Sequence, residues 1–224
     1  SINVIQAGCN RMFEGQMTPL IDSLLDGDAA GAAEQAEKLR KEGITEDEII
    51  LEGIEKAMIQ LDAKCTVDQF NLLEIMLCGR AAMTVIKELY PSGSPPSHTQ
   101  ATVVLASLKG DIHDLGKNIV KMILTAMGYR VIDCGKDCAA EKVIETAEKE
   151  AAAAVGISGL ITTIIPQITQ LRNMLSERDL RPVKILAGGA ALKQASAENL
   201  GVDFVAENAF DGLHFLDTLY RGGE

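Results

Sequence analysis

One histidine of the sequence, His113, stands between two aspartates, Asp111 and Asp114, in a loop bounded by Gly110 and Gly116. Imidazole nitrogen is a common metal ligand. The residue types and their spacing therefore make His113 a candidate metal ligand.

The other two histidines fit this chemistry less well. His98 lies alone in a stretch rich in proline and serine, where we expect a solvated side chain. His214 lies among Leu213, Phe215 and Leu216 in a helical pattern, which is typical of an ordinary helix residue.

A strand and a helix must hold the His113 loop in place. Residues 101–108 are a β-branched apolar run that predicts a buried strand. Residues 117–128 carry apolar side chains every three or four positions and end at Gly128, which predicts an amphipathic helix. The same alternation continues along the chain. Further strands are expected at 130–134, 153–158, 183–187 and 203–206, and helices at 140–151, at 167–177, in a short segment that ends at Leu200, and at 208–220. This pattern predicts an α/β fold with a five-stranded parallel, doubly wound sheet of the Rossmann or flavodoxin-like type.

The loops after four of these strands carry the residues best suited to a ligand. The carboxyl ends of parallel strands meet at one edge, which is where open α/β sheets bind ligands. Gly116 and the pair Gly188 and Gly189 leave room for a large group against the backbone. Ser158 and Thr162 offer hydroxyls to amide or phosphate groups.

The first part of the chain carries only helical patterns. We expect a small helical bundle over 1–90, a proline-rich linker over 91–99 and the α/β domain over 100–224. Helices are predicted at 18–25, 28–41, 46–61 and 67–89, with Asp28 capping the second, Gly43 ending it, and capping boxes beginning at Thr45 and Thr66. The last helix is apolar nearly all round, which fits either the centre of the bundle or a cover over a flat hydrophobic ligand.

Composition excludes several classes of function. The net charge is −11, from 21 basic and 32 acidic residues, which argues against nucleic acid as a partner. We expect neither a membrane span nor a secretory leader, and hence a cytoplasmic protein with its five cysteines as reduced thiols. Cys134 and Cys138 are separated by three residues, which matches none of the usual zinc patterns.

Nucleotide-binding motifs are a poor match to the central loop. Five residues separate Gly110 from Gly116, where a P-loop has four, and Asn118 stands where a P-loop needs a hydroxyl. No G-x-G-x-x-G follows any predicted strand. A phosphoacceptor site on such a sheet would need an acidic cluster, and His113 between Asp111 and Asp114 fits that badly.

Three motifs in order carry a resemblance to a known family. They are D-x-H-x-x-G at 111–116, S-x-L at 158–160 and G-G at 188–189. Together they resemble the cobalamin-binding signature of the methionine synthase class, and the helical region ahead of them resembles the cap domain of that class. The resemblance covers nearly the whole chain, in the arrangement of the stand-alone corrinoid methyl-carrier proteins of cobalamin-dependent methyltransferase systems.

The resemblance implies roles for individual residues. Cobalamin would bind with its own base displaced, His113 would be the lower axial ligand of cobalt, and Asp111 would hold its ring. A serine found in methionine synthase six residues after Ser158 is Ile164 here, so the relay from His113 would end at Asp111 or water. The cofactor-binding residues implied are Gly110, Asp111, Ile112, His113, Asp114, Gly116, Ser158, Leu160, Thr162, Gly188, Gly189 and Ala209, with Leu72, Met76 and Met83 of the cap as the residues expected over the upper cobalt face.

The resemblance also implies a function and partners. The corrinoid would alternate between methylcobalamin and cob(I)alamin as it carries a methyl group. It would receive the group from a donor-side methyltransferase and pass it to a second methyltransferase that uses tetrahydrofolate. A reductive activase would be a third partner, and the chain would not be catalytic alone. The alternatives are a cobalamin-dependent mutase subunit, a cobalamin-based sensor, and a flavodoxin-like nucleotide-binding protein without cobalamin.

Overall fold

The structure is a computed structural model that describes residues 15–64, 71–91 and 101–221 of the 224-residue chain. The chain divides into two compact units, one built mainly from the helices before residue 92 and the other from the residues after 100. Within the described residues, no helix is long and apolar enough to cross a membrane.

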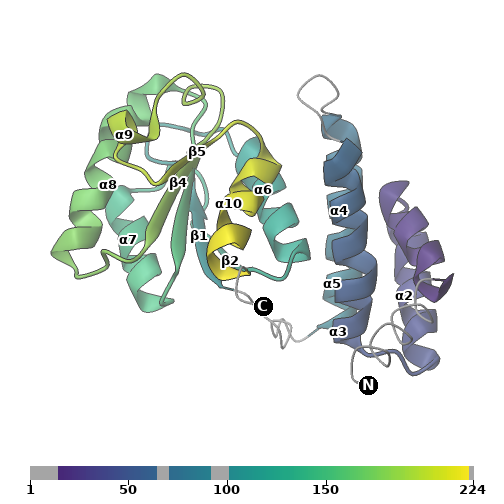
Figure 1. Ribbon diagram of the computed structural model, residues 1–224. Helices are drawn as coiled ribbons and strands as arrows, with labels where there is room; N and C mark the ends of the chain where they lie inside the picture. The colour runs from purple at the N-terminus through teal and green to yellow at the C-terminus, as the bar shows by residue number, and fades with distance from the viewer. Residues whose placement is uncertain (1–14, 65–70, 92–100, 222–224) are drawn as a thin grey trace. The chain divides into compact units, whose positions relative to one another are not determined.

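The first unit is entirely helical (Figure 1). Its elements are a helix over 15–25, α2 (Ala29–Lys41), α3 (Glu46–Ile49), a π-helical turn (Ile50–Ile54), α4 (Glu55–Lys64) and α5 (Leu72–Leu89). The caps predicted for the second and third helices are confirmed. The Asp28 side chain accepts a hydrogen bond from the Gly31 N–H, and Thr45 forms a capping box with Glu48. Gly43 ends α2 with a φ of 91°, a left-handed conformation that glycine adopts easily.

Two helices of this unit differ from the prediction. The third is continuous from Glu46 to Lys64 but contains the π turn. The fourth begins at Leu72, five residues later than predicted, because Asn71 has extended backbone and its side chain accepts a hydrogen bond from the Glu74 N–H. The capping box expected from Thr66 lies outside the described residues.

The second unit contains the predicted parallel sheet. Its strands are β1 (Thr102–Ala106), β2 (Arg130–Asp133), β3 (Ala154–Ser158), β4 (Lys184–Gly188) and β5 (Phe204–Ala206). The strand order is β2-β1-β3-β4-β5 and every neighbouring pair is parallel, which is the flavodoxin-like arrangement. The predicted fold class is confirmed, with strand ends that differ by one or two residues.

Helices cover both faces of this sheet. They are α6 (Leu115–Ala126), α7 (Ala140–Lys149), α8 (Ile165–Glu177) preceded by a 3-10 turn (Thr162–Ile164), α9 (Ala197–Leu200) and α10 (Ala209–Tyr220). Figure 1 shows α6 and α10 on one face and α7 and α8 on the other, as right-handed crossovers require. α6 begins two residues earlier than predicted, so its first turn directly follows His113 and Asp114.

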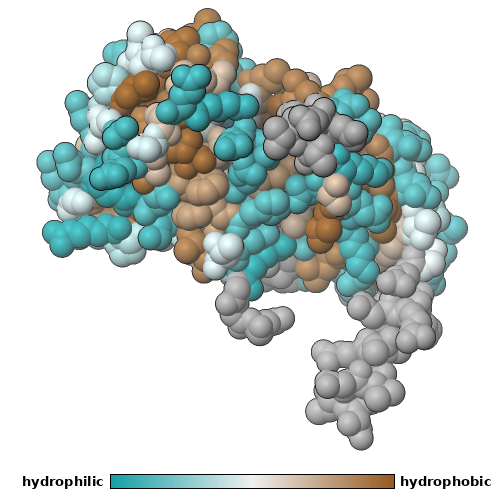
Figure 2. All heavy atoms as spheres, turned by 45° about the horizontal axis from the view of Figure 1, so that its top comes forward, coloured by the Kyte–Doolittle hydropathy of each residue, from teal (hydrophilic) through white to brown (hydrophobic). Residues whose placement is uncertain are grey.

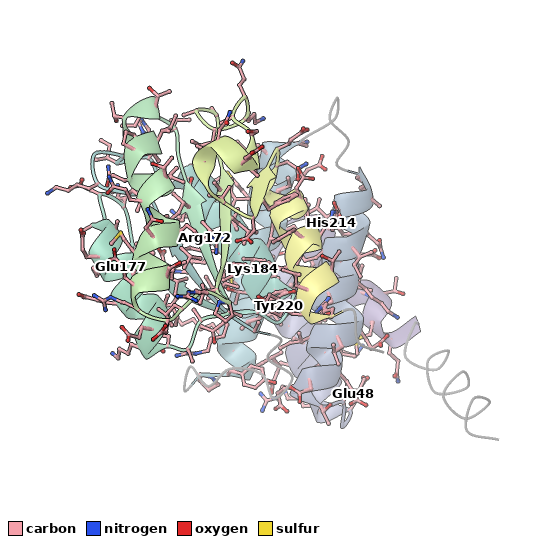
Figure 3. The ribbon with its side chains drawn as sticks, turned by 60° about the vertical axis from the view of Figure 1, so that its left-hand side comes forward. Glu48, Arg172, Glu177, Lys184, His214 and Tyr220 are labelled. Atoms are coloured by element: carbon pink, nitrogen blue, oxygen red, sulfur yellow. The ribbon has the colours of Figure 1, made fainter. Side chains whose placement is uncertain are left out.

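An ionic cluster ties together the amino-terminal ends of β4 and β5. The Asp203 carboxylate pairs with both Arg172 and Lys184 and also accepts a hydrogen bond from the Ile185 N–H. Nearby, the Tyr220 hydroxyl donates to the Ala153 carbonyl at 3.0 Å (Figure 3). Burial acts to raise the pKa of Asp203, but these hydrogen bonds and the two cations outweigh it and hold the pKa below its ordinary value. The cluster stabilises the sheet at the edge opposite the His113 loop.

Candidate functional site

The loop between β1 and α6 lies at the carboxyl edge of the sheet and is centred on a buried carboxylate. The Asp111 side chain is fully buried. Its Oδ1 accepts a hydrogen bond from the His113 N–H at 2.9 Å and lies 2.8 Å from His113 Nδ1. Its Oδ2 accepts from the Leu160 N–H at 2.7 Å. Asp111 therefore joins the loop after β1 to the loop after β3.

The imidazole of His113 is held on one side and open on the other. Its side chain is 51% exposed. Because Nδ1 lies within hydrogen-bond distance of a buried carboxylate, that nitrogen carries the proton in the neutral ring, and Nε2 is left to bind a metal. The predicted contact between Asp111 and His113 is present.

The charge of Asp111 is maintained in spite of its burial. Burial acts to raise the pKa of this carboxyl, but the hydrogen bonds from the Leu160 and His113 backbone and from the His113 ring outweigh it, so the net pKa lies below its ordinary value. A carboxylate that stays ionised strengthens the electron-donating character of the ring it holds.

The loops after β3 and β4 meet beside this pair through the backbone of glycine residues. The Gly159 N–H donates to the Gly188 carbonyl at 2.8 Å. Gly189 has a φ of 113°, and a Cβ at this position would lie 2.3 Å from the Gly159 carbonyl oxygen. A Cβ on Gly116 would lie 3.5 Å from the Ser158 hydroxyl, which places α6 next to the end of β3. The predicted glycines thus bring three loops into close contact.

Large apolar side chains surround His113 at the surface. Ile112 is 64% exposed, Leu115 50% and Leu160 47%. These are three of the four large apolar side chains that are exposed in the described part of this unit. Figure 2, which brings the top of Figure 1 forward, shows apolar atoms at the surface of the unit among polar ones. Exposed apolar side chains around a potential metal ligand are suited to a large, flat, hydrophobic ligand.

The remaining predicted site residues occupy varied positions. Gly110 and Thr162 are exposed, and Asp114 pairs with Lys136 at 3.6 Å. Ala209 begins α10 at the same sheet edge. His214 is exposed on α10 (Figure 3), and His98 lies outside the described residues.

The residues expected from the cap lie in the first unit, on α5. Leu72 is 39% exposed, and Met76 and Met83 are partly buried. They share a helix face that differs from the buried one, which is formed by Ile75, Cys78, Ala82, Val85 and Leu89. Their contact with a cofactor stays a prediction.

Sequence reasoning missed several residues that support the loop. The Ser107 hydroxyl is buried and donates to the His113 carbonyl at 2.9 Å. Lys117, 3% exposed, pairs with Asp133 at 2.6 Å. A serine at the end of an apolar run and a lysine within an apolar helix are the signals that could have drawn attention to them.

At this edge, His113 is the candidate ligand for a metal. No group of three or more His, Cys, Asp or Glu side chains suited to a metal ion occurs within the described ranges. A lone imidazole suits a metal that brings its other ligands with it, as cobalt does in a corrin ring. The exposed apolar side chains around His113 and the small residues beside it fit such a group.

Comparison with known families agrees with this chemistry. The B12 binding domain family matches residues 101–214, and a second family, also described as a B12 binding domain, matches residues 17–90. A corrinoid protein of Desulfitobacterium hafniense is 30% identical over 213 residues, which cover 93% of this chain and 99% of the relative. Dimethylamine corrinoid protein 3 of Methanosarcina acetivorans is 32% identical over 205 residues, 90% of this chain and 95% of the relative.

A solved structure of known function has a similar fold. The methanol:cobalamin methyltransferase complex MtaBC from Methanosarcina barkeri contains a chain that matches with a TM-score of 0.80 and 25% identity, over 93% of this chain and 80% of that one. The fold and the site therefore define a cobalamin-binding protein. The chain belongs to the family of corrinoid proteins of methyltransferase systems, and its cofactor is a corrinoid. These matches exclude the alternative of a nucleotide-binding protein that uses no cobalamin.

Proposed function

We propose that this protein carries a methyl group between two methyltransferases, with its corrinoid bound base-off and His113 as the lower axial ligand. The observation that carries the proposal is the His113 ring, half exposed and bound through Nδ1 to the buried Asp111 carboxylate. When bound, the corrinoid supplies a cobalt that accepts and releases the methyl group.

The residues around His113 would prepare it for this role. Asp111 fixes the tautomer with Nε2 free, and its own position is fixed by the Leu160 N–H. The relay from the ring ends at this main-chain group, since Ile164 is fully buried and has no polar side-chain atom to extend it. Ile112, Leu115 and Leu160 would lie against the ring system of the cofactor and exclude water there.

The other predicted loop residues would hold the remainder of the cofactor. In this proposal, Ser158, Gly188, Gly189, Thr162 and Ala209 line the path of its nucleotide tail. The support for this assignment is that these residues lie in the loops after β3, β4 and β5, at the carboxyl edge of the sheet, where open α/β sheets bind ligands.

The helical unit would act as a cap. We propose domain limits at residues 1–90 and 100–224, joined by a linker at 91–99, with Leu72, Met76 and Met83 facing the upper side of cobalt. The second B12-binding match, over 17–90, supports a role for this unit in corrinoid binding. Exposed apolar side chains at the start of α5, Leu72 and Leu73, are suited to such a contact.

The partners would be proteins. Relatives are named for dimethylamine and trimethylamine systems, and a structural neighbour belongs to a methanol system, so one carrier design serves several methyl donors. We propose that the donor is chosen by a donor-side methyltransferase. The acceptor-side enzyme would use tetrahydrofolate, and a reductive activase would restore oxidised cofactor.

The test of this proposal is the spectrum of bound cobalamin. The wild-type chain, His113→Ala and the control His214→Ala are each loaded with aquocobalamin and methylcobalamin and compared by ultraviolet–visible spectroscopy. We expect a histidine-ligated spectrum in the wild type and in His214→Ala, and a spectrum without a protein ligand in His113→Ala. Identical spectra for all three proteins would refute the assignment of His113.

A further inference from the structure

A loop outside the cobalamin-binding motifs holds the His113 loop from the side. It runs over residues 134–139, between β2 and α7, and is here called the β2–α7 loop. Asp137 makes two bonds across to the His113 loop: its Oδ1 accepts from the Gly110 N–H at 2.7 Å, and its own N–H donates to the Asp111 carbonyl at 3.0 Å. Asp137 has a φ of 52°, a left-handed conformation that is uncommon for a residue other than glycine.

A second connection passes through Ser107. The Ser107 N–H donates to the Gly135 carbonyl, and the Ser107 carbonyl accepts from the Cys138 N–H, both at 3.0 Å. The Ser107 hydroxyl then donates to the His113 carbonyl at 2.9 Å. Ser107 is fully buried, so water does not replace the hydrogen bond that its hydroxyl makes.

The β2–α7 loop is itself fixed to the helix that follows His113. The Asp133 Oδ1 accepts from the Gly135 N–H at 2.9 Å and from the buried Lys117 ammonium at 2.6 Å. Lys117 belongs to the first turn of α6. A closed ring of contacts therefore runs from Lys117 through Asp133, Gly135 and Ser107 to His113, which lies four residues before Lys117.

The His113 segment needs this support. Residues 109–114 contain no helix or strand, and the half-exposed ring of His113 is held by a hydrogen bond with the Asp111 side chain. A displacement of about 1 Å in a group that binds or reacts at a metal is enough to lower its effectiveness strongly. The backbone of the segment must therefore be held by its neighbours.

We infer that Asp137 and Ser107 are positioning residues for His113, so that the β2–α7 loop controls how well this histidine ligates the corrinoid. The inference rests on the proposed role of His113. It adds two residues outside the family motifs to those that set cobalt ligation: Asp137 from the β2–α7 loop, and Ser107, which directly follows β1.

The test separates the Asp137 side chain from its backbone conformation. Asp137→Gly keeps the left-handed φ and removes the carboxylate, whereas Asp137→Asn keeps an oxygen at Oδ1 and tolerates the same φ. Asp179→Gly is the matched control, because Asp179 also has a positive φ, 58°, and lies in the exposed loop after α8. Ser107→Ala removes the second connection.

Each full-length variant is loaded with methylcobalamin at pH 7, and the ratio of histidine-ligated to unligated cofactor is read from the visible spectrum. We expect this ratio to fall about tenfold in Asp137→Gly and in Ser107→Ala, which corresponds to about 1.4 kcal/mol. Asp137→Asn and Asp179→Gly keep the wild-type ratio. Hydrogen exchange of the Gly110 amide is measured in parallel in the apoproteins. We expect it to be faster than wild type in Asp137→Gly, which removes the acceptor of this amide, and unchanged in Asp137→Asn and Asp179→Gly.

The outcomes distinguish this inference from the proposed function. If the wild type and His113→Ala give the same spectrum, the role of His113 fails and the inference fails with it. If the wild type shows histidine ligation and Asp137→Gly and Ser107→Ala keep the wild-type ratio, the proposed function stands and the positioning role is refuted. An equal loss in Asp179→Gly would refute it as well, by showing a general effect of glycine.

Discussion

The substitution Asp111→Asn tests the account of the buried carboxylate. Asp111 accepts three hydrogen bonds, from the Leu160 N–H, the His113 N–H and His113 Nδ1, while its side chain is fully buried. An amide of the same shape has one accepting atom and one donating group. Asn at this position therefore turns an NH2 group toward at least one buried backbone N–H, whichever way it is oriented.

The expected loss of stability follows from these contacts. A buried donor left without an acceptor costs about 1–3 kcal/mol, and bonds to an ionised group are about twice as strong as neutral ones. We expect Asp111→Asn to lower the free energy of unfolding of the sheet unit by about 2–4 kcal/mol at pH 7. The control Asp114→Asn alters a side chain that is 41% exposed, and we expect less than about 0.5 kcal/mol there.

The dependence on pH gives the sharper test. The pKa of Asp111 is lower in the folded protein than its ordinary value, so its stabilising effect is complete above the unfolded pKa of about 3.9 and is lost as pH falls through the folded value. The difference between wild type and Asp111→Asn should therefore narrow below about pH 4. Urea unfolding followed by circular dichroism at pH 7 and at pH 3.5 measures both quantities. A difference under 0.5 kcal/mol at pH 7, or one that does not change with pH, would refute the reasoning.

Four further perturbations have defined outcomes. Ala151, just after α7, has a left-handed φ of 48°, and the Ala152 N–H that follows it donates to the Ala147 carbonyl at the helix end. Because glycine adopts this φ more easily, Ala151→Gly should raise the free energy of unfolding in urea by about 0.5–1 kcal/mol. Gly201→Ala, at the left-handed end of α9, should lower the free energy of unfolding. A rise in stability for this variant would contradict the explanation given for Ala151→Gly. Gly189→Ala places a Cβ 2.3 Å from the Gly159 carbonyl oxygen, so we expect the free energy of unfolding to fall by about 1–3 kcal/mol and corrinoid uptake to weaken. Wild-type stability and uptake would show that the loops are not closely packed. Burial raises the pKa of the Cys78 thiol to about 11, so little of it is thiolate at pH 8. Its alkylation by iodoacetamide, measured by mass spectrometry, should therefore be about a hundredfold slower in the folded protein than in the protein unfolded in urea. Equal rates in the two states would contradict its burial.

The fold was largely predictable because its signals are local. Val103, Val104 and Leu105 form a β-branched and apolar run that makes a strand buried on both faces, and the amphipathic helices between such runs force a parallel sheet. The start of α3 was predicted because its cap, Thr45, directly precedes it. The start of α5 was missed because the cap is Asn71, five residues after the predicted one. The π turn was not predictable, since it lies where Gly53 packs against Leu20, and that contact joins distant positions.

The same distinction holds for the site. Asp111 and His113 are two residues apart, so their contact could be foreseen from the chain. The Leu160 N–H reaches Asp111 from 49 positions away, and Lys117 reaches Asp133 from 16. Such pairings depend on how the strands are ordered in the sheet, which a sequence motif does not encode. Asp137 escaped notice for the same reason, because the partner of its side chain, Gly110, lies 27 residues earlier in the chain.

The central claim is that the imidazole of His113 ligates cobalt in place of the cofactor's own base. Its most direct test is electron paramagnetic resonance of bound cob(II)alamin, with the protein grown on ordinary or nitrogen-15-labelled histidine. An axial nitrogen-14 splits each cobalt line into three, and nitrogen-15 splits it into two. The account predicts that the triplets of the unlabelled protein become doublets in the labelled one. Triplets that persist in the labelled protein would show that the cofactor keeps its own base and would contradict the account.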